Sequence, residues 1–247
     1  MQKKLKEKQI ESFYKYWGDE TQCNHFLYLL PKSTLGTDNV IVDIGGGVGF
    51  FADSVRKLID AEIRVLDADP IAIKTCLDKG INAYLDNALK PTYHGDEDVV
   101  CFNLILHHLI GDDECSTLNL QIQAIKVWSD HCKFIFVNEY SYDSYIKNLS
   151  GRLIYLITSN KLLSIIASFI SRFVPSLRAN TFGVGVRFRG GDEWVKLFEQ
   201  SGFRVISKVK GEQKDIPFPR RLLFVKNFSQ DSWLLEPLVK STIGIVN

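Results

Sequence analysis

The fold is decided by the stretch Val40-Ile41-Val42-Asp43-Ile44-Gly45-Gly46-Gly47-Val48-Gly49, which is followed by a helix-compatible run over residues 51–59. A short apolar run that ends in glycines predicts a buried parallel strand, a tight turn and the start of a helix. Glycine lets the backbone approach a ligand closely. An aspartate in an apolar strand is costly unless it meets hydrogen-bond donors. A purely structural turn would account for the glycines, whereas a nucleotide-like ligand over the turn also accounts for Asp43.

The spacing of the glycines separates two kinds of nucleotide site. The dinucleotide fingerprint G-x-G-x-x-G requires a third glycine after two intervening residues, but Phe50 stands at that position when counting starts from Gly45. The pattern present is G-x-G-x-G with an acidic residue before it. This pattern resembles the first motif of the class I S-adenosylmethionine-dependent methyltransferases. An NAD-dependent oxidoreductase shares the strand-helix-strand unit and stays an alternative, although Phe50 disfavours it.

The following segments resemble the later motifs of the same family, in the same order. The second expected strand ends in Asp67, eighteen residues after Gly49, where an acidic residue is placed to bind ribose hydroxyls. The third leads to Asp86, and in the family an acid at this position commonly contacts the adenine amino group. The fourth runs into Leu-Ile-Leu-His-His-Leu at residues 104–109, as in small-molecule methyltransferases.

The resemblance implies a Rossmann-like, doubly wound α/β fold. Its seven-stranded sheet has the order 3-2-1-4-5-7-6, with the last strand antiparallel, a helical N-terminal flap and a helical insertion after the fifth strand. The strands are expected at residues 40–44, 63–67, 81–85, 98–103, 133–139, 203–210 and 221–227. The single domain then divides into a flap (1–38), a cofactor-binding core (39–140), a helical cap (141–190) and the completion of the sheet (191–247). The residues expected to bind S-adenosylmethionine are Asp43, Gly45, Gly46, Gly47, Gly49, Asp67, Ala68, Asp86, Asn87, Asn103 and Leu104.

Catalysis with this cofactor needs mainly alignment of the acceptor and exclusion of water, because a methyl group on a sulfonium is already activated. A general base helps when the acceptor is an alcohol, a phenol or a protonated amine, and histidine titrates near neutrality. We therefore expect His107 or His108 to act as the base and favour His107, although either could equally pack under the cofactor loop. The residues expected near the substrate are Tyr16, Trp17, Glu139, Tyr140, Arg187 and Arg189.

Two segments outside the core leave their roles open. The aromatic and apolar residues before Pro31 predict two short helices, the first ending at Gly18, that either cover the sheet edge or close over the cofactor. Within residues 151–175, apolar residues at helical spacing opposite serines and basic residues predict an amphipathic helix. That helix could pack on the sheet or on a second copy, line an apolar substrate pocket, or contact a bilayer surface. Arg187 and Arg189, which alternate in an extended piece, could hold an anionic substrate group or be solvated.

The composition of the chain indicates which kinds of partner are not expected. The chain has 247 residues, a net charge of +1 and 45% hydrophobic residues, so nothing in its charge favours a nucleic acid. Its five cysteines form no C-x-x-C pair, and with no secretory leader in the sequence we expect reduced thiols and a cytoplasmic location. Histidine and cysteine show no metal-ligand spacing, so no metal is expected. Charges interrupt the apolar stretch after residue 151, so stable membrane insertion is not expected.

The acceptor is the least determined feature. Enzymes of the resembling fold that methylate DNA amines or protein glutamines usually carry N-P-P-Y or D-P-P-Y after the fourth strand, but residues 103–106 read Asn-Leu-Ile-Leu. We expect a small, partly hydrophobic metabolite, with O-methylation slightly ahead of N- or C-methylation. A protein that binds the cofactor without transferring its methyl group is the second alternative.

Overall fold

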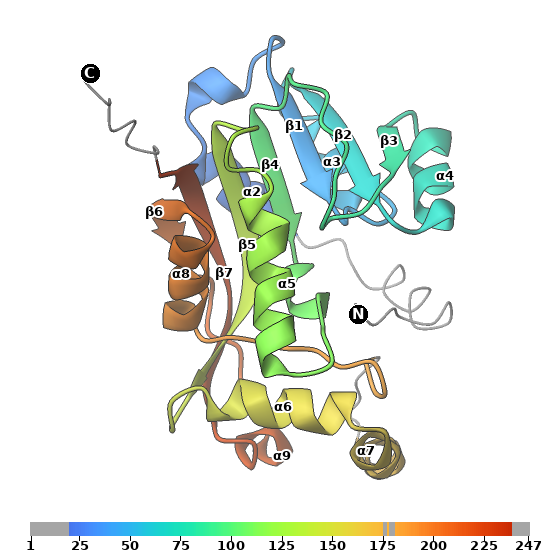
Figure 1. Ribbon diagram of the computed structural model, residues 1–247, viewed down its shortest axis with the longest axis vertical. Helices are drawn as coiled ribbons and strands as arrows, with labels where there is room; N and C mark the ends of the chain where they lie inside the picture. The colour runs from blue at the N-terminus through green and yellow to red at the C-terminus, as the bar shows by residue number, and fades with distance from the viewer. Residues whose placement is uncertain (1–19, 175–176, 178–180, 239–247) are drawn as a thin grey trace, which may run out of the picture.

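The computed structural model describes residues 20–174, 177 and 181–238. These residues form a seven-stranded mixed sheet with helices packed on it (Figure 1). The strands are β1 (Val40–Ile44), β2 (Glu62–Asp67), β3 (Asn82–Leu85), β4 (Val99–Asn103), β5 (Phe134–Ser144), β6 (Phe203–Val209) and β7 (Val225–Pro237). Their spatial order is β3-β2-β1-β4-β5-β7-β6, and β7 runs antiparallel to both of its neighbours. The predicted order and the antiparallel last strand are confirmed. This order differs from the 3-2-1-4-5-6 order of the dinucleotide-binding fold.

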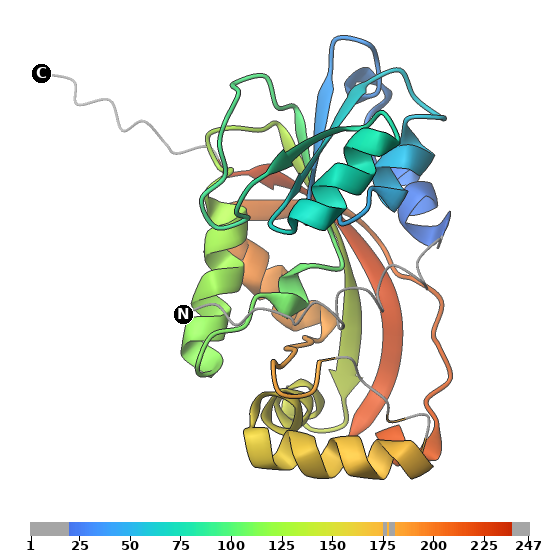
Figure 2. The same ribbon diagram turned by 90° about the vertical axis from the view of Figure 1, so that its right-hand side faces the viewer.

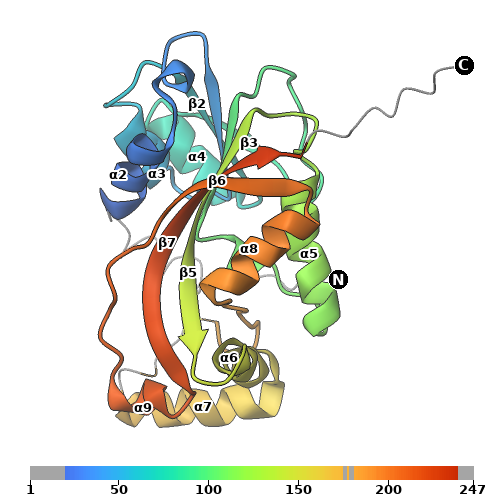
Figure 3. The same cartoon turned by 90° about the vertical axis from the view of Figure 1, so that its left-hand side faces the viewer.

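Helices cover both faces of the sheet (Figure 3). The helices of these two layers are α2 (Glu20–Leu29), α3 (Phe50–Val55), α4 (Pro70–Asp78), α5 (Glu114–Lys126) and α8 (Gly191–Gln200), with the short 3-10 turns η1 (Lys32–Thr34) and η2 (Leu106–His108) between elements. The first three helices bury apolar side chains in one core cluster, and α5 and α8 do so in a second cluster on the opposite face. The parallel strands therefore end at one common edge, with α3 and α4 beginning beside it.

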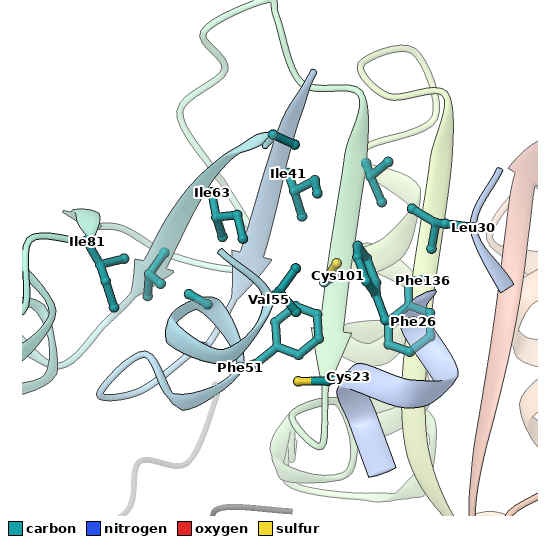
Figure 4. Close-up of a cluster of buried hydrophobic side chains, with 14 of the residues drawn as sticks. Cys23, Phe26, Leu30, Ile41, Phe51, Val55, Ile63, Ile81, Cys101 and Phe136 are labelled. Carbon is teal, nitrogen blue, oxygen red and sulfur yellow. The ribbon is translucent and has the colours of Figure 1, made fainter. Parts of the chain in front are cut away.

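The first core cluster shows what α2 does (Figure 4). Phe26 of α2 is fully buried, and its ring meets Phe51 and Phe136 edge-on, with ring centroids 5.3 Å apart in each pair. Burial of one such side chain contributes roughly 1.5–3 kcal/mol. The described part of the N-terminal region is thus held in the core of the sheet. The helix predicted before Gly18, with Tyr16 and Trp17, lies outside the described residues.

The two longest strands, β5 and β7, differ from their expected bounds. The strand predicted at 221–227 is wrong, because β7 begins at Val225 and continues to Pro237. Its central residues are polar and buried: Asn138 of β5 donates to the Ser232 hydroxyl at 2.7 Å and accepts from Gln230 at 2.8 Å. A buried polar strand gives no apolar run in the sequence, which explains the error. Residues 218–221 instead form a short helix, α9 (Phe218–Arg221).

The segment after β5 forms two helices rather than one. They are α6 (Leu149–Ser159) and α7 (Lys161–Phe173), and the side chain of Asn160 between them accepts from the backbone N–H groups of Leu162 and Leu163. Both helices lie at the end of the molecule toward which β5 points (Figure 1, Figure 2). No single helix in the described ranges is long and apolar enough to cross a membrane. Only α6 and α7 counted together have the required length and hydrophobicity, and the two helices are bent by 96° relative to each other.

Candidate active site

The glycine turn after β1 lies at the carboxyl edge of the parallel strands. Gly45, Gly47 and Gly49 have φ values of 66°, 55° and 76°, which favour glycine. Gly46 is required for a different reason, since a Cβ atom there would lie 2.4 Å from Oδ2 of Asp43. At the four glycines of residues 45–49, side chains are thus excluded by backbone conformation or by close packing, while the side chain of Val48 is buried.

Asp67, the last residue of β2, is bound to this turn. Its Oδ2 accepts the backbone N–H of Gly47 at 2.9 Å, and its Oδ1 accepts that of Asp69 at 2.8 Å. Burial raises the pKa of Asp67, although the two backbone donors act against this shift. Each carboxylate oxygen has two acceptor positions, so both oxygens retain capacity for a further donor. The contact unites two residues that the sequence places at the cofactor.

Asp43 lies beneath the same turn. It is fully buried, and its Oδ1 accepts from the Asn103 side chain at 2.9 Å. Its Oδ2 has no hydrogen-bond partner in the part of the chain that the structure describes. Burial raises the pKa of Asp43 to about 7, the hydrogen bond from Asn103 opposes this, and the charge of Asp67 adds to it. An unpaired buried acceptor is costly, which indicates that a donor from a ligand or a water belongs at this turn.

The remaining predicted cofactor residues lie at the same edge. The backbone N–H of Asp86 donates to the carbonyl of Asp67 at 2.9 Å, so the third acid lies beside the second. Its carboxylate accepts from the backbone of Asn87 at 2.6 Å and of Thr92 at 2.7 Å and thereby shapes its own loop. Ala68 follows Asp67 directly and is exposed.

Leu104 follows β4 directly and has an unusual backbone conformation. Its φ is 55°, a region that non-glycine residues seldom occupy and that costs of order 1–3 kcal/mol. Its backbone N–H donates to the carbonyl of Asn138 at 2.8 Å, which holds the strained residue against β5. The chain turns sharply there and leads into η2, which carries both histidines.

His107 and Glu139 form a buried pair between η2 and β5. Nδ1 of His107 lies 2.6 Å from Oε2 of Glu139, and the Glu139 carboxylate also accepts from the backbone of Leu106 at 2.6 Å and of Tyr140 at 3.3 Å. Because these backbone groups only donate, we assign Glu139 as the acceptor throughout and Nδ1 as protonated. Nε2 is then the nitrogen that can take a proton from an acceptor group. Glu139 therefore contacts the imidazole directly, and its expected place near the substrate stays a prediction.

His108 has a different environment from its neighbour. Its ring centroid lies 4.1 Å from that of His107, and burial together with the nearby His107 holds the pKa of His108 well below its usual value. A group that stays neutral is a weak base. Of the two candidate bases, His107 therefore has the better supported position.

Aromatic side chains of β5, β7 and the segment before α8 form a connected group beside His107. The ring centroid of Phe188 lies 4.7 Å from that of His107 and 4.5 Å from that of Tyr142. Tyr140 and Phe228 complete the group, which we call the aromatic cluster, with centroids 5.2 Å apart. Burial raises the pKa of Tyr142 to about 12, so its hydroxyl stays protonated. Only Tyr140 was predicted. The signal for Tyr142 was its two-residue spacing from Tyr140, but the predicted strand ended at residue 139.

Arg187 and Arg189 come together, but their partners are internal. Both are buried: Arg187 pairs with Glu114 at 2.9 Å and with Glu193 at 3.0 Å, while Nε of Arg189 donates to Gln121 at 2.7 Å. Burial and the adjacent Arg187 lower the pKa of Arg189 to about 10. The solvated alternative is wrong because these side chains are inside the protein. Their proposed contact with substrate stays a prediction, and their observed contacts link α5 to α8.

Neither a protein-family model nor a curated protein matches the sequence. Solved structures match the fold. The mitomycin 7-O-methyltransferase MmcR shares 14% identity over 88% of this chain and 53% of its own, with a TM-score of 0.53. Geranyl diphosphate C-methyltransferase from Streptomyces coelicolor A3(2), in complex with Mg2+, geranyl diphosphate and S-adenosyl-L-homocysteine, shares 10% over 94% and 83%, with a TM-score of 0.55. A structure described as a pericyclic reaction enzyme shares 13% over 88% and 46%, with a TM-score of 0.54.

These likenesses establish the architecture. The chain has the class I S-adenosylmethionine-dependent methyltransferase fold, in agreement with its strand order. It spans about half the length of MmcR and of the pericyclic reaction enzyme. Because proteins of one fold can carry out different reactions, the activity has to be argued from the site.

Proposed function

We propose that this protein is an S-adenosylmethionine-dependent methyltransferase that acts on a small, partly hydrophobic metabolite, with a hydroxyl group as the favoured acceptor. The observation that carries the proposal is the contact between Asp67 and the backbone of Gly47. It joins the acid that would bind the ribose to the turn that would lie along the amino-acid part of the cofactor. The unpaired Oδ2 of Asp43 beside that turn supports the same ligand.

The residues at this edge fit the chemical groups of the cofactor. Both carboxylate oxygens of Asp67 have acceptor capacity for the two ribose hydroxyls. Asp43 would stabilise a positively charged amino group near the turn, since an opposite charge favours the ionised carboxylate. Asp86 is held beside Asp67 by a 2.9 Å backbone hydrogen bond and would face the adenine of the cofactor. The four glycines of the turn at residues 45–49 would leave room for close approach of the cofactor.

The His107–Glu139 pair supports a reaction that needs a base. S-adenosylmethionine supplies a methyl group already activated by its sulfonium. Nε2 of His107 would take the proton from the acceptor hydroxyl as the new O–CH3 bond forms and the bond from methyl carbon to sulfur breaks. Glu139, fixed by backbone donors, holds the imidazole in the required tautomer. General-base catalysis of this kind typically contributes about 10²–10⁴-fold.

The aromatic cluster supports a partly hydrophobic acceptor. Phe188, Tyr140 and Phe228 lie around His107 and Tyr142 and present ring faces and edges, with the Lys214 ammonium 5.9 Å over the rings of Tyr140 and Phe228 as the cation beside them. Aromatic pairs contribute roughly 0.5–1.5 kcal/mol beyond the burial of their area. A ring or alkyl group of an acceptor beside His107 would gain from the same contacts, so we favour this class over strongly charged metabolites.

The two alternatives make different predictions. An NAD-dependent oxidoreductase is disfavoured by the order of the sheet as well as by Phe50. A protein that binds the cofactor without transferring its methyl group would need the glycine turn and Asp67 but not the buried His107–Glu139 pair. The pair is therefore the feature that favours catalysis over binding alone.

The proposal is tested with methyl-labelled S-adenosylmethionine. We would incubate the full chain and its His107→Ala variant with a cell extract separated into small-molecule, protein and nucleic-acid fractions. Label that enters only the small-molecule fraction, and does so at least about 10²-fold more slowly with the variant, is expected. Label confined to the macromolecular fractions would refute the acceptor class. No transfer to any fraction, with cofactor binding intact, would favour the binding protein.

A further inference from the structure

Helix α7 turns its polar side inward and its apolar side to the surface, which is the reverse of an ordinary amphipathic helix in a globular protein. Ser164 and Ser171 face inward and are buried, and their hydroxyls donate to backbone carbonyls of the same helix at 2.9 and 2.8 Å. The large apolar residues face outward. We call this outward set the apolar face of α7: Leu162, Ile165, Ile166, Phe169, Ile170 and Phe173, each between 44% and 74% exposed. A surface helix normally turns its apolar stripe to the core, so a contiguous exposed face of this kind marks an interaction site.

Apolar residues of other elements are exposed at the same end of the molecule. Phe218 of α9 and Leu222 directly after it are 72% and 65% exposed, and Tyr145 and Ile146, on the turn into α6, are also exposed. The ends of β5 and β7, with α6, α7 and α9, lie together at this end in all three views (Figure 1, Figure 2, Figure 3). The apolar face of α7 is thus part of a larger exposed apolar end.

All charged side chains in residues 144–191, which include α6 and α7, are positive. Residues 144–191 contain seven lysines and arginines and no aspartate or glutamate, in a chain whose net charge is only +1. Two of the seven, Arg187 and Arg189, are buried in the ion pairs described above. Lys161 and Arg172 of α7 are exposed next to its apolar face, and Lys147 and Arg152 are exposed before and within α6. An apolar helical face flanked by exposed basic groups is the arrangement of interfacial helices that bind anionic lipids.

We propose that this end of the protein docks onto an anionic lipid surface, with the apolar face of α7 immersed at the headgroup boundary. Two observations favour a lipid surface over the other occupants of an apolar face. A symmetric dimer would bring the same patch of each copy together, and residues 144–191 offer no carboxylate to compensate the facing cations. A span would need ~20 apolar residues in one helix, whereas α7 has 13 residues and is bent by 96° from α6.

The test is flotation of the full chain with vesicles of phosphatidylcholine alone and of phosphatidylcholine with about one third phosphatidylglycerol. We expect binding to the anionic vesicles that falls with added salt, since screening weakens attraction between exposed charges. Phe169→Asp with Phe173→Asp should lower the bound fraction at least tenfold. Lys161→Glu with Arg172→Glu should remove the preference for phosphatidylglycerol. Leu77→Asp, which changes an exposed leucine of α4, is the matched control and should bind as the unaltered protein does.

Two further measurements keep the outcome decisive. Far-ultraviolet circular dichroism and thermal unfolding verify that each variant is folded, which is expected because the altered side chains are exposed. Analytical ultracentrifugation tests the second copy as occupant. Failure of the unaltered chain to float with anionic vesicles would overturn the proposal, as would unchanged flotation of the Phe169 and Phe173 variant. A dimer that this variant dissociates, in a protein that ignores vesicles, would assign the face to a second copy. None of these measurements requires the cofactor, so their results do not depend on whether the proposed methyltransferase activity is correct.

Discussion

Nδ1 of His107 lies 2.6 Å from Oε2 of Glu139, and the two side chains are 5% and 0% exposed. The pair joins η2, which follows β4, to the neighbouring strand β5, across 32 residues of sequence. The carboxylate is further held by the backbone N–H groups of Leu106 and Tyr140. The imidazole is therefore fixed in position and in tautomer before any substrate arrives, which is the state that a general base requires.

The tautomer of His107 gives the first prediction. Nitrogen NMR of the histidine side chains should show the proton of neutral His107 on Nδ1, and Glu139→Gln should remove that preference. We also expect Glu139→Gln to lower the free energy of unfolding by about 1.5–3 kcal/mol, the usual contribution of a hydrogen bond to a charged group. A His107 proton on Nε2 in the unaltered protein would contradict the assigned role of Glu139.

Asp67 should control cofactor affinity. Asp67→Ala removes a carboxylate that would bind two hydroxyls, and hydrogen bonds to charged groups contribute about 1.5–3 kcal/mol each, so S-adenosylhomocysteine should bind at least about 10²-fold more weakly in calorimetry. Asp69→Ala is the matched control. Its carboxylate caps α4 through the N–H of Ile71, so we expect a loss of about 1 kcal/mol of stability and nearly unchanged affinity. Equal affinity losses in the two variants would contradict the placement of the ribose.

The buried Asp43 predicts a dependence of stability on pH. Its pKa is about 7 in the folded protein against a usual 3.8, so the folded state binds the proton more tightly than the unfolded state. The contribution of Asp43 to the free energy of unfolding therefore falls by up to about 4 kcal/mol as the pH rises from about 4 to 7. Above pH 7 it stays low. Asp43→Asn, which can still accept from Asn103, should gain stability relative to the unaltered protein between pH 5 and pH 8 in urea unfolding. A difference that does not change with pH would contradict this account.

Gly46 should tolerate no side chain. A Cβ there would lie 2.4 Å from Oδ2 of the buried Asp43, so Gly46→Ala must displace the turn or the aspartate. We expect at least a tenfold loss of S-adenosylhomocysteine affinity. Gly36→Ala is the control, because its Cβ would meet its nearest neighbour at an ordinary 3.9 Å. Gly47→Val should also lose binding, since Gly47 has a φ of 55°. Normal affinity in Gly46→Ala would show that the ligand does not depend on this turn.

Arg187 should prove structural. Arg187→Met removes the nearer of the two arginines that pair with Glu193, at 3.0 Å against 3.6 Å for Arg189. We expect a loss of about 1–3 kcal/mol in the free energy of unfolding with little change in cofactor affinity. Adding Glu193→Gln should recover part of the loss, because it removes a carboxylate that has lost its shorter ion pair. A stable Arg187→Met protein with impaired turnover would instead support the contact with substrate that the sequence suggested.

Local patterns predicted the parts of the molecule that depend on neighbouring residues in the chain. The glycine turn and Asp67 follow from apolar strands and glycine spacing, whereas the order of the sheet is what the family resemblance implies. Helix α4 has proline at its first position and glycine two residues after its end, as the preferences of these residues favour. The helix after the glycine turn is shorter than the run over residues 51–59 indicates and ends at Val55.

Long-range contacts explain what the sequence could not predict. Strand β7 contains a buried polar run because Ser232 and Gln230 pair with Asn138 of β5, and no local pattern shows such partners. The His107–Glu139 contact required the registration of β4 and β5, although both residues were expected at the same edge. For α7, the periodicity gave the two faces correctly but could not show that Ser164 faces inward and Phe169 outward. That orientation depends on what surrounds the helix.

The central claim is that S-adenosylmethionine binds between the glycine turn and Asp67. Isothermal titration of the full chain with S-adenosylhomocysteine, in parallel with NADH, tests it most directly. We predict saturable binding of one S-adenosylhomocysteine per chain and no heat of binding with NADH. Binding of NADH, or the absence of binding by S-adenosylhomocysteine at millimolar concentration, would contradict the assignment.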